Sequence, residues 1–199
     1  MMRRALFVDK DGTLVDNVPY NVDPARIRFA SGAIDALQRL QARGYVVIVV
    51  SNQAGVAYGR FQECALVAVQ EALRQRLASA DVTLAAMYWC PHHPAATVAR
   101  YRVQCTCRKP LAGMLHRAAQ EHELDLESSW MVGDILDDVE AGRRARCRTV
   151  LLDNGHETQW QISHLRLPHS VVPDMARAAD AILTADAAVV ANLHPVRLS

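Results

Sequence analysis

One short segment limits the possible folds of this chain more than any other. Residues 45–51 read Tyr-Val-Val-Ile-Val-Val-Ser, an apolar run with side chains on both faces of an extended strand. A strand that is buried on both faces is typical of the centre of a parallel sheet covered by helices. The segment therefore predicts a parallel sheet, with 45–51 as one of its central strands.

Short apolar runs alternate with longer helical patterns along most of the chain. Expected strands are 4–9, 45–51, 85–90, 129–133, 148–152 and one near 170–172; expected helices are 32–43, about 61–79, 112–123, 136–145 and one near 174–184. This alternation predicts a Rossmann-like α/β fold, a parallel sheet with helices on both faces and right-handed crossovers. We expect a single domain over residues 1–185, followed by a loosely attached C-terminal tail at 186–199.

Composition excludes several classes of protein. The 199 residues have a formal net charge of +1 and 51% hydrophobic content, which argues against disorder and against a basic nucleic-acid or membrane-surface binder. The longest apolar run, Leu84 to Cys90, is too short for a membrane helix, and no targeting segment is visible. We expect a cytoplasmic monomer that acts on a small molecule, with reduced cysteines.

Polar residues gather where the predicted strands end. Asp9-Lys10-Asp11-Gly12-Thr13 follows the first strand, and Gly133-Asp134 ends another, with Asp138 four residues later. Ser51 ends the central strand, and Lys109 is one of two lysines in the chain. A simple turn would explain one Asp and the Gly, but not this whole set. Because ligands bind beyond the carboxyl ends of parallel strands, these residues predict one site.

This ordered set resembles the motifs of the haloacid dehalogenase-like phosphohydrolases. The matching residues are Asp9-x-Asp11-Gly12-Thr13, Ser51, Lys109 and Gly133-Asp134-x-x-x-Asp138. The resemblance implies that Asp9 is a nucleophile and Asp11 an acid/base. It also implies a Mg²⁺ site formed by the Asp9 side chain, the Asp11 backbone carbonyl and the Asp134 side chain.

Elementary chemistry agrees with these roles. A carboxylate can attack phosphorus and form an aspartyl-phosphate. Two facing carboxylates repel each other unless a hard cation such as Mg²⁺ lies between them. Asp11 can then protonate the leaving group and later deprotonate water, while Ser51 and Lys109 hold the phosphoryl oxygens.

A second group of residues predicts a different metal. Cys90-Pro91-His92 and Cys105-Thr106-Cys107 each place two donors at positions i and i+2, which point the same way in an extended chain. Three thiolates and one imidazole suit a closed, structural Zn²⁺ site. Spacing favours His92 over His93 as the ligand, and His93 then supports the loop. Cys64 and Cys147 are interpreted as core cysteines.

The predicted zinc loop at 90–107 narrows the resemblance. It is similar to that of the D-glycero-D-manno-heptose 1,7-bisphosphate 7-phosphatases of bacterial heptose synthesis, and related histidinol-phosphate phosphatases share it. The resemblance implies that this loop replaces a large cap domain, and that Arg108 recognises substrate. It also implies substrate contacts from residues 17–20 and 51–54, which gives four further candidates: Asn17, Tyr20, Asn52 and Gln53.

One position leaves the substrate open. Ile135 stands directly after Asp134, where the heptose enzymes usually carry a basic residue, and an isoleucine cannot hold a phosphate. We expect a Mg²⁺-dependent phosphatase with a structural zinc that acts on a heptose bisphosphate. The alternatives are a histidinol-phosphate phosphatase and a non-catalytic zinc-stapled binding module. Tyr20 and the segment 155–158 are further candidates for a place near the site, but their residues alone favour surface loop.

Overall fold

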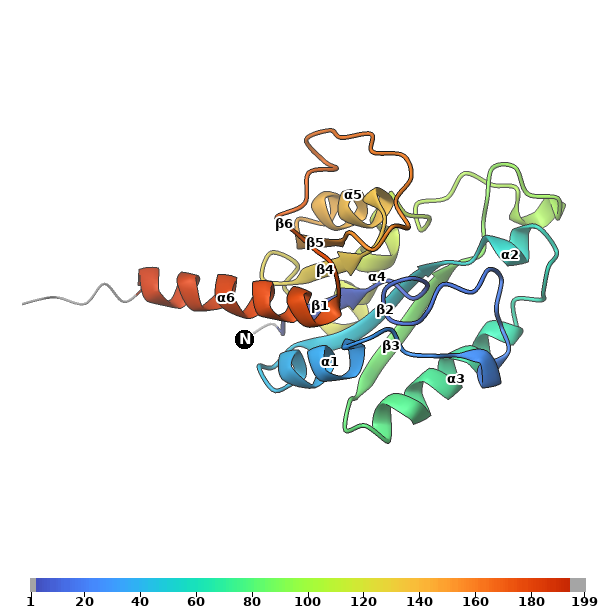
Figure 1. The fold of residues 1–199 in the computed structure, drawn as a ribbon. Coiled ribbons are helices and arrows are strands. Elements are labelled where there is room, and N and C mark those ends of the chain that lie inside the picture. Colours follow the sequence, from blue (N-terminus) through green and yellow to red (C-terminus); the bar gives the residue numbers. More distant parts are fainter. Residues whose placement is uncertain (1–2, 194–199) are drawn as a thin grey trace, which may run out of the picture.

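A six-stranded parallel sheet forms the centre of the computed structural model, which describes residues 3–193 (Figure 1). Its strands are β1 (Ala5–Val8), β2 (Val46–Asn52), β3 (Leu84–Cys90), β4 (Trp130–Gly133), β5 (Arg148–Leu152) and β6 (Ser170–Val172). Their order across the sheet is β3-β2-β1-β4-β5-β6. The strands that carry the predicted site residues, β1, β2 and β4, are therefore neighbours at the middle of the sheet.

Helices cover both faces of this sheet. The helices are α1 (Ala33–Gln41), α2 (Ala54–Ala57), α3 (Ala65–Ala78), α4 (Gly113–His122), α5 (Leu136–Arg144) and α6 (Met175–Leu193), with short 3₁₀ turns at Pro24–Arg26 and Ala99–Tyr101. Residues of α1, α3 and α6 pack in one apolar cluster with one face of the sheet. Residues of α4 and α5 pack in a second cluster with the other face. The predicted α/β class is confirmed.

The central strand behaves as its composition predicts. Val47 and Val49 of β2 belong to the cluster on one face, and Ile48 and Val50 belong to the cluster on the other. All four are at most 1% exposed. Burial on both faces explains why the strand has no alternation of polar and apolar residues.

The structure corrects the bounds of two predicted helices. The helix expected at about 61–79 begins only at Ala65, and the separate short helix α2 precedes it. The last helix extends from Met175 to Leu193 instead of ending near 184. Asp186, within the predicted tail, accepts hydrogen bonds from Arg4 and Tyr45, so the tail is not loose at this point. Residues 194–199 of that tail lie outside the described residues.

Two long connections leave the carboxyl end of the sheet and matter for the site. One joins β3 to α4 and contains three of the four predicted zinc ligands, the fourth being Cys90 at the end of β3, and the other joins β5 to β6 over residues 153–169. Among the helices of residues 3–193, none is both long and apolar enough to cross a membrane.

Candidate active site

The first functional turn follows β1 directly. Asp9 comes after Val8, and the chain then turns back so that the amide of Leu14 donates to the Asp9 carbonyl. Gly12 has a φ of +87°, in the left-handed region that favours glycine. A side chain at Gly12 would collide with the Asp134 carboxylate, so this position needs glycine for space as well. The turn thus brings the β1 end against the β4 end.

Lys109 occupies the centre of the site. Its Nζ lies 2.5 Å from Asp9 Oδ1, 2.6 Å from Asp138 Oδ1 and 3.0 Å from the Val50 carbonyl. The lysine is only 2% exposed. Burial by itself lowers the pKa of Lys109, but the carboxylates of Asp138 and Asp9 outweigh burial and raise it. The ammonium therefore stays charged and offsets two buried carboxylates.

The backbone of Lys109 is held as firmly as its side chain. Asn52, at the end of β2, accepts a hydrogen bond from the Lys109 amide and donates one to the Lys109 carbonyl, both 3.0 Å long. Both ends of the Asn52 side chain are thus committed to one residue. Asn52 remains a predicted substrate contact, but its two hydrogen bonds in this structure hold the Lys109 backbone in place.

Three carboxylates meet beside this lysine. One oxygen each from Asp9, Asp134 and Asp138 lies within 4.8 Å of the other two, and all three residues are buried. Burial and then the charge of Asp9 raise the pKa of Asp134 to about 7. Burial also raises the pKa of Asp138, against the opposing effect of the Lys109 ammonium. Buried oxygen donors of like charge are the ligand set that a hard divalent cation such as Mg²⁺ fits.

The Asp11 carboxylate contacts residues other than those around Lys109. It accepts hydrogen bonds from Lys10 Nζ at 2.5 Å and from Gln53 Nε2 at 3.0 Å. Gln53 also donates to Ser51 Oγ, which leaves the Ser51 hydroxyl hydrogen free to donate elsewhere. Burial raises the pKa of Asp11, only partly opposed by Lys10, as a general acid requires.

The remaining predicted substrate residues have contacts of other kinds. Asn17 and Tyr20 are exposed, and Arg60 stacks on the Tyr20 ring. Arg108 is half-buried and donates to the His92 carbonyl at 3.3 Å. Ile135 contributes a backbone amide to Asp138, and its side chain takes no polar role.

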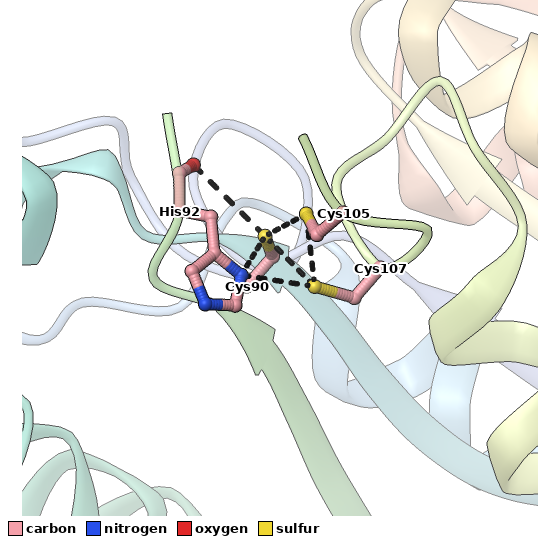
Figure 2. Close-up of side chains that lie close together, drawn as sticks. All are labelled: Cys90, His92, Cys105 and Cys107. Carbon is pink, nitrogen blue, oxygen red and sulfur yellow. Dashed lines mark hydrogen bonds between the residues drawn. The ribbon is translucent and has the colours of Figure 1, made fainter. Parts of the chain in front are cut away.

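The four predicted zinc ligands meet at one point (Figure 2). The sulfur of Cys107 lies 3.1 Å from Cys90 and 3.2 Å from Cys105, and Cys90 lies 3.5 Å from Cys105. His92 Nδ1 is 3.4 Å from Cys107 and 3.7 Å from Cys90. A tetrahedral zinc site with ordinary bond lengths has S···S edges of about 3.8 Å and S···N edges of about 3.5 Å. The donor set therefore fits zinc after a small expansion.

Hydrogen bonds within this cluster favour the thiolate form of one of its cysteines. The hydrogen bond between Cys107 and Cys90 lowers the pKa of Cys107 to about 5 and, together with burial, raises that of Cys90. A thiolate is the form that binds metal. His93 lies outside the cluster, where its ring contacts the Tyr58 hydroxyl, consistent with support of the loop.

Comparison with known proteins places this site in a family. A family model described as HAD-hydrolase-like matches residues 106–178. A D-glycero-β-D-manno-heptose-1,7-bisphosphate 7-phosphatase of Escherichia coli K12 is 36% identical over 179 residues, which cover 90% of this chain and 87% of that protein. A protein of the same description from Pasteurella multocida is 40% identical over 77% of this chain and 84% of its own. The chain belongs to the haloacid dehalogenase-like phosphatases.

Solved structures of such phosphatases agree with the fold. A putative HAD-like phosphatase from Mesorhizobium loti has a TM-score of 0.79 and 30% identity, covering 92% of this chain and 87% of its own. A D,D-heptose 1,7-bisphosphate phosphatase from B. bronchiseptica, complexed with magnesium and phosphate, has a TM-score of 0.76 and 30% identity over 92% and 99%. The recognition of the family and of a phosphatase from sequence motifs is confirmed.

Two expectations from the sequence, one about Cys64 and one about the segment 155–158, were wrong. Cys64 is exposed, because α3 begins one residue after it and its side chain does not reach the core. Cys147 is buried, as predicted. The segment 155–158 is not merely surface loop: His156 Nδ1 lies 2.7 Å from Asp134 Oδ2, inside the phosphatase site. Nearness to the site was the less favoured alternative from the sequence, and it follows from the place of the segment after β5, next to β4 in the sheet.

Proposed function

We propose that this phosphatase removes the 7-phosphate of D-glycero-D-manno-heptose 1,7-bisphosphate in a Mg²⁺-dependent reaction. The observation that carries the chemistry is the convergence of Asp9, Asp134 and Asp138 around Lys109. The substrate rests on the relatives named above, which match most of the chain. Bound Mg²⁺ would be held by Asp9, the Asp11 carbonyl and Asp134, and would neutralise charge on the carboxylates and the phosphoryl group.

The reaction has two steps in this proposal. A carboxylate oxygen of Asp9 attacks phosphorus, the bond between phosphorus and the sugar O7 breaks, and Asp11 gives its proton to that oxygen. Water then attacks the phosphoryl-Asp9 and loses a proton to Asp11, which releases phosphate and restores both carboxyl groups. The contacts of Asp11 with Lys10 and Gln53 hold it beside Asp9 in both steps.

The phosphoryl oxygens need donors that are already in place. Ser51 offers its hydroxyl hydrogen, because its oxygen is engaged by Gln53. Lys109 Nζ, fixed by Asp9, Asp138 and the Val50 carbonyl, supplies the cation. Such preorganised groups stabilise developing charge without reorganisation during the reaction.

The rest of the substrate contacts the rim in this proposal. Arg108 binds the sugar bisphosphate from the zinc loop, Asn17, Tyr20 and Gln53 contact it at the rim, and Asn52 acts through Lys109, to which both ends of its amide are hydrogen-bonded. Zinc has a structural role, because four protein donors leave it no open position.

A comparison of substrates tests the proposal. Turnover is measured with both anomers of heptose 1,7-bisphosphate, with histidinol phosphate and with p-nitrophenyl phosphate, with and without Mg²⁺. We expect the highest kcat/KM on one anomer of the heptose bisphosphate, and no turnover without Mg²⁺. Faster turnover of histidinol phosphate would contradict the substrate. Absence of turnover on every compound would contradict the catalytic assignment and favour a binding module.

A further inference from the structure

We propose that His156 is a positioning residue for Asp134, and that residues Asn154–Glu157 form a strap that holds it there. The proposal rests on the metal role of Asp134 given above. It concerns a segment that the reaction scheme does not use. The side chains of Asn154, His156 and Glu157 contact three different parts of the catalytic centre.

Each side chain of the strap is hydrogen-bonded to a different element of the site. Asn154 Nδ2 donates to the Gly12 carbonyl at 2.7 Å, in the turn that follows the nucleophile. His156 Nδ1 lies 2.7 Å from Asp134 Oδ2, and the amide of Leu136, at the start of α5, donates to Glu157 Oε2 at 2.7 Å. Because these anchors belong to different elements, the strap fixes their relative positions.

The fold explains why this segment reaches the site. β5 pairs with β4, and β4 pairs with β1, so the chain leaving β5 passes the ends of both strands (Figure 1). The connection then crosses α5, where Arg166 bonds Asp137 at 2.6 Å and Glu140 at 2.7 Å. The connection is thus held near its start by Asn154 and Glu157 and near its end by Arg166. His156 therefore lies in a segment that is held at both ends.

Asp134 is held at both carboxylate oxygens. Thr13 Oγ1 donates to Oδ1 at 3.2 Å, and His156 bonds Oδ2. A carboxylate can only accept, so His156 Nδ1 carries the hydrogen in this contact. Each oxygen keeps a second lone pair for a cation, while rotation of the carboxylate is blocked. This is how outer hydrogen bonds orient a metal-binding side chain and raise its affinity.

Glycine at position 12 permits this arrangement. A side chain there would overlap both Asp134 and His156, so the turn leaves open the space in which the two meet. The His156 side chain is one-third exposed, whereas that of Asp134 is only 4% exposed. The imidazole thus covers the carboxylate on its solvent side.

Metal binding is the direct test. Binding of Mn²⁺ to the purified protein is followed by electron paramagnetic resonance of the free ion, and Mg²⁺ is then used as competitor. We expect His156→Ala to weaken the binding of both ions by about tenfold, in the range known for such outer contacts. His156→Asn, which keeps an N–H donor near the same position, should restore most of the affinity. His164→Ala, an exposed histidine of the same connection, should bind as the wild type does.

The outcomes separate this inference from the proposed function. If the wild type binds neither ion, or if Asp134→Asn binds both ions as well as the wild type, the metal role of Asp134 fails. If the wild type binds and His156→Ala binds equally well, the inference about His156 is overturned. A raised KM with unchanged metal affinity would also overturn it and make His156 a substrate contact. Should His156→Ala not fold, Asn154→Ala replaces it, with a loss of about threefold expected and wild-type affinity contradicting the strap.

Discussion

Two groups of candidate metal-ligand side chains lie at the same end of this sheet, and the fold holds them together in different ways. In the carboxylate cluster, which consists of Asp9, Asp134 and Asp138, the first two residues directly follow β1 and β4, and Asp138 lies in the first turn of α5. Its members are at most 7% exposed, and Lys109 already lies among them. The core of the domain therefore assembles this cluster, and a cation of the protein's own partly balances its charge.

The thiol cluster, consisting of Cys90, His92, Cys105 and Cys107, lies mostly in a loop. Only Cys90 belongs to a strand, and the other three are half-buried. Its donors are held together chiefly by contacts with each other, and the two pairs are separated by twelve residues of connection. Such a cluster depends on its metal far more than a cluster on strand ends does.

The two clusters meet at two consecutive residues. Lys109 is held from the sheet side, by Asn52, Val50, Asp9 and Asp138. Within the described chain, Arg108 makes its side-chain hydrogen bond to the carbonyl of His92 in the zinc loop. We infer that the carboxylate side controls the chemical step through Lys109, and that the thiol side controls substrate binding through Arg108. Each prediction below tests this division.

The largest effect is expected for Asp9→Asn. An amide is a poor nucleophile and a poor Mg²⁺ ligand, so turnover should fall by at least about 10⁴-fold. Thermal unfolding should show a folded protein. Asp35→Asn, an exposed aspartate of α1, should keep wild-type turnover. Substantial turnover by purified Asp9→Asn would remove the nucleophile from the carboxylate cluster.

A smaller and selective loss is expected for Asp11→Asn. A general acid contributes roughly 10²- to 10⁴-fold, and it matters most when the leaving group is a poor one. The variant should therefore lose much more activity on a sugar phosphate than on p-nitrophenyl phosphate. Equal losses on the two substrates would assign Asp11 to a structural or metal-binding role.

Sequence patterns could predict that Asp9 and Asp134 share one site, because the topology of the sheet alone brings them together. The two-sided apolar run of β2 indicates the parallel sheet, and parallel strands end at a common edge, where Asp9 and Asp134 follow. The i, i+2 spacing of the cysteines predicts the thiol cluster in the same local way.

Other features depend on contacts that no local pattern encodes. The segment 153–169 has no strand or helix period, so the meeting of His156 with Asp134 depends on the order of the strands and on a loop path. Asn52 was expected to face substrate, and only the structure shows both ends of its amide bound to Lys109. Cys64 was misplaced because the start of α3 was predicted too early.

The thiol side is tested by Cys107→Ala. Loss of one ligand should release zinc and loosen the loop that places Arg108, so KM should rise by about 10- to 100-fold while kcat changes much less. Metal analysis should find about one zinc per chain in the wild type and far less in the variant. Cys64→Ala, an exposed cysteine outside the cluster, is the matched control and should keep both zinc and kinetics. Unchanged KM in Cys107→Ala would contradict the role given to the loop.

The smallest effect, and the sharpest test of the division, is expected for Asn52→Ala. The variant removes both hydrogen bonds that hold the Lys109 backbone, but it leaves the three contacts of the lysine Nζ in place. We expect kcat to fall by about 3- to 10-fold, since each lost hydrogen bond contributes about 1 kcal/mol and the remaining contacts partly compensate. KM should change little, because Arg108 is held from the other side.

Combining the two variants decides whether these residues are held independently. If Asn52 acts on Lys109 and the zinc loop acts on Arg108, the losses in kcat/KM of Asn52→Ala and Cys107→Ala should add within about 0.5 kcal/mol in the double variant. Strong coupling would mean that the loop also determines where Lys109 lies, and that one mechanical unit spans both clusters. Substitutions that act on two adjacent residues, such as Arg108 and Lys109, are usually coupled in their effects on kcat/KM. Additive losses would therefore show that the sheet fixes the position of Lys109, so that the chemical step does not depend on the conformation of the loop.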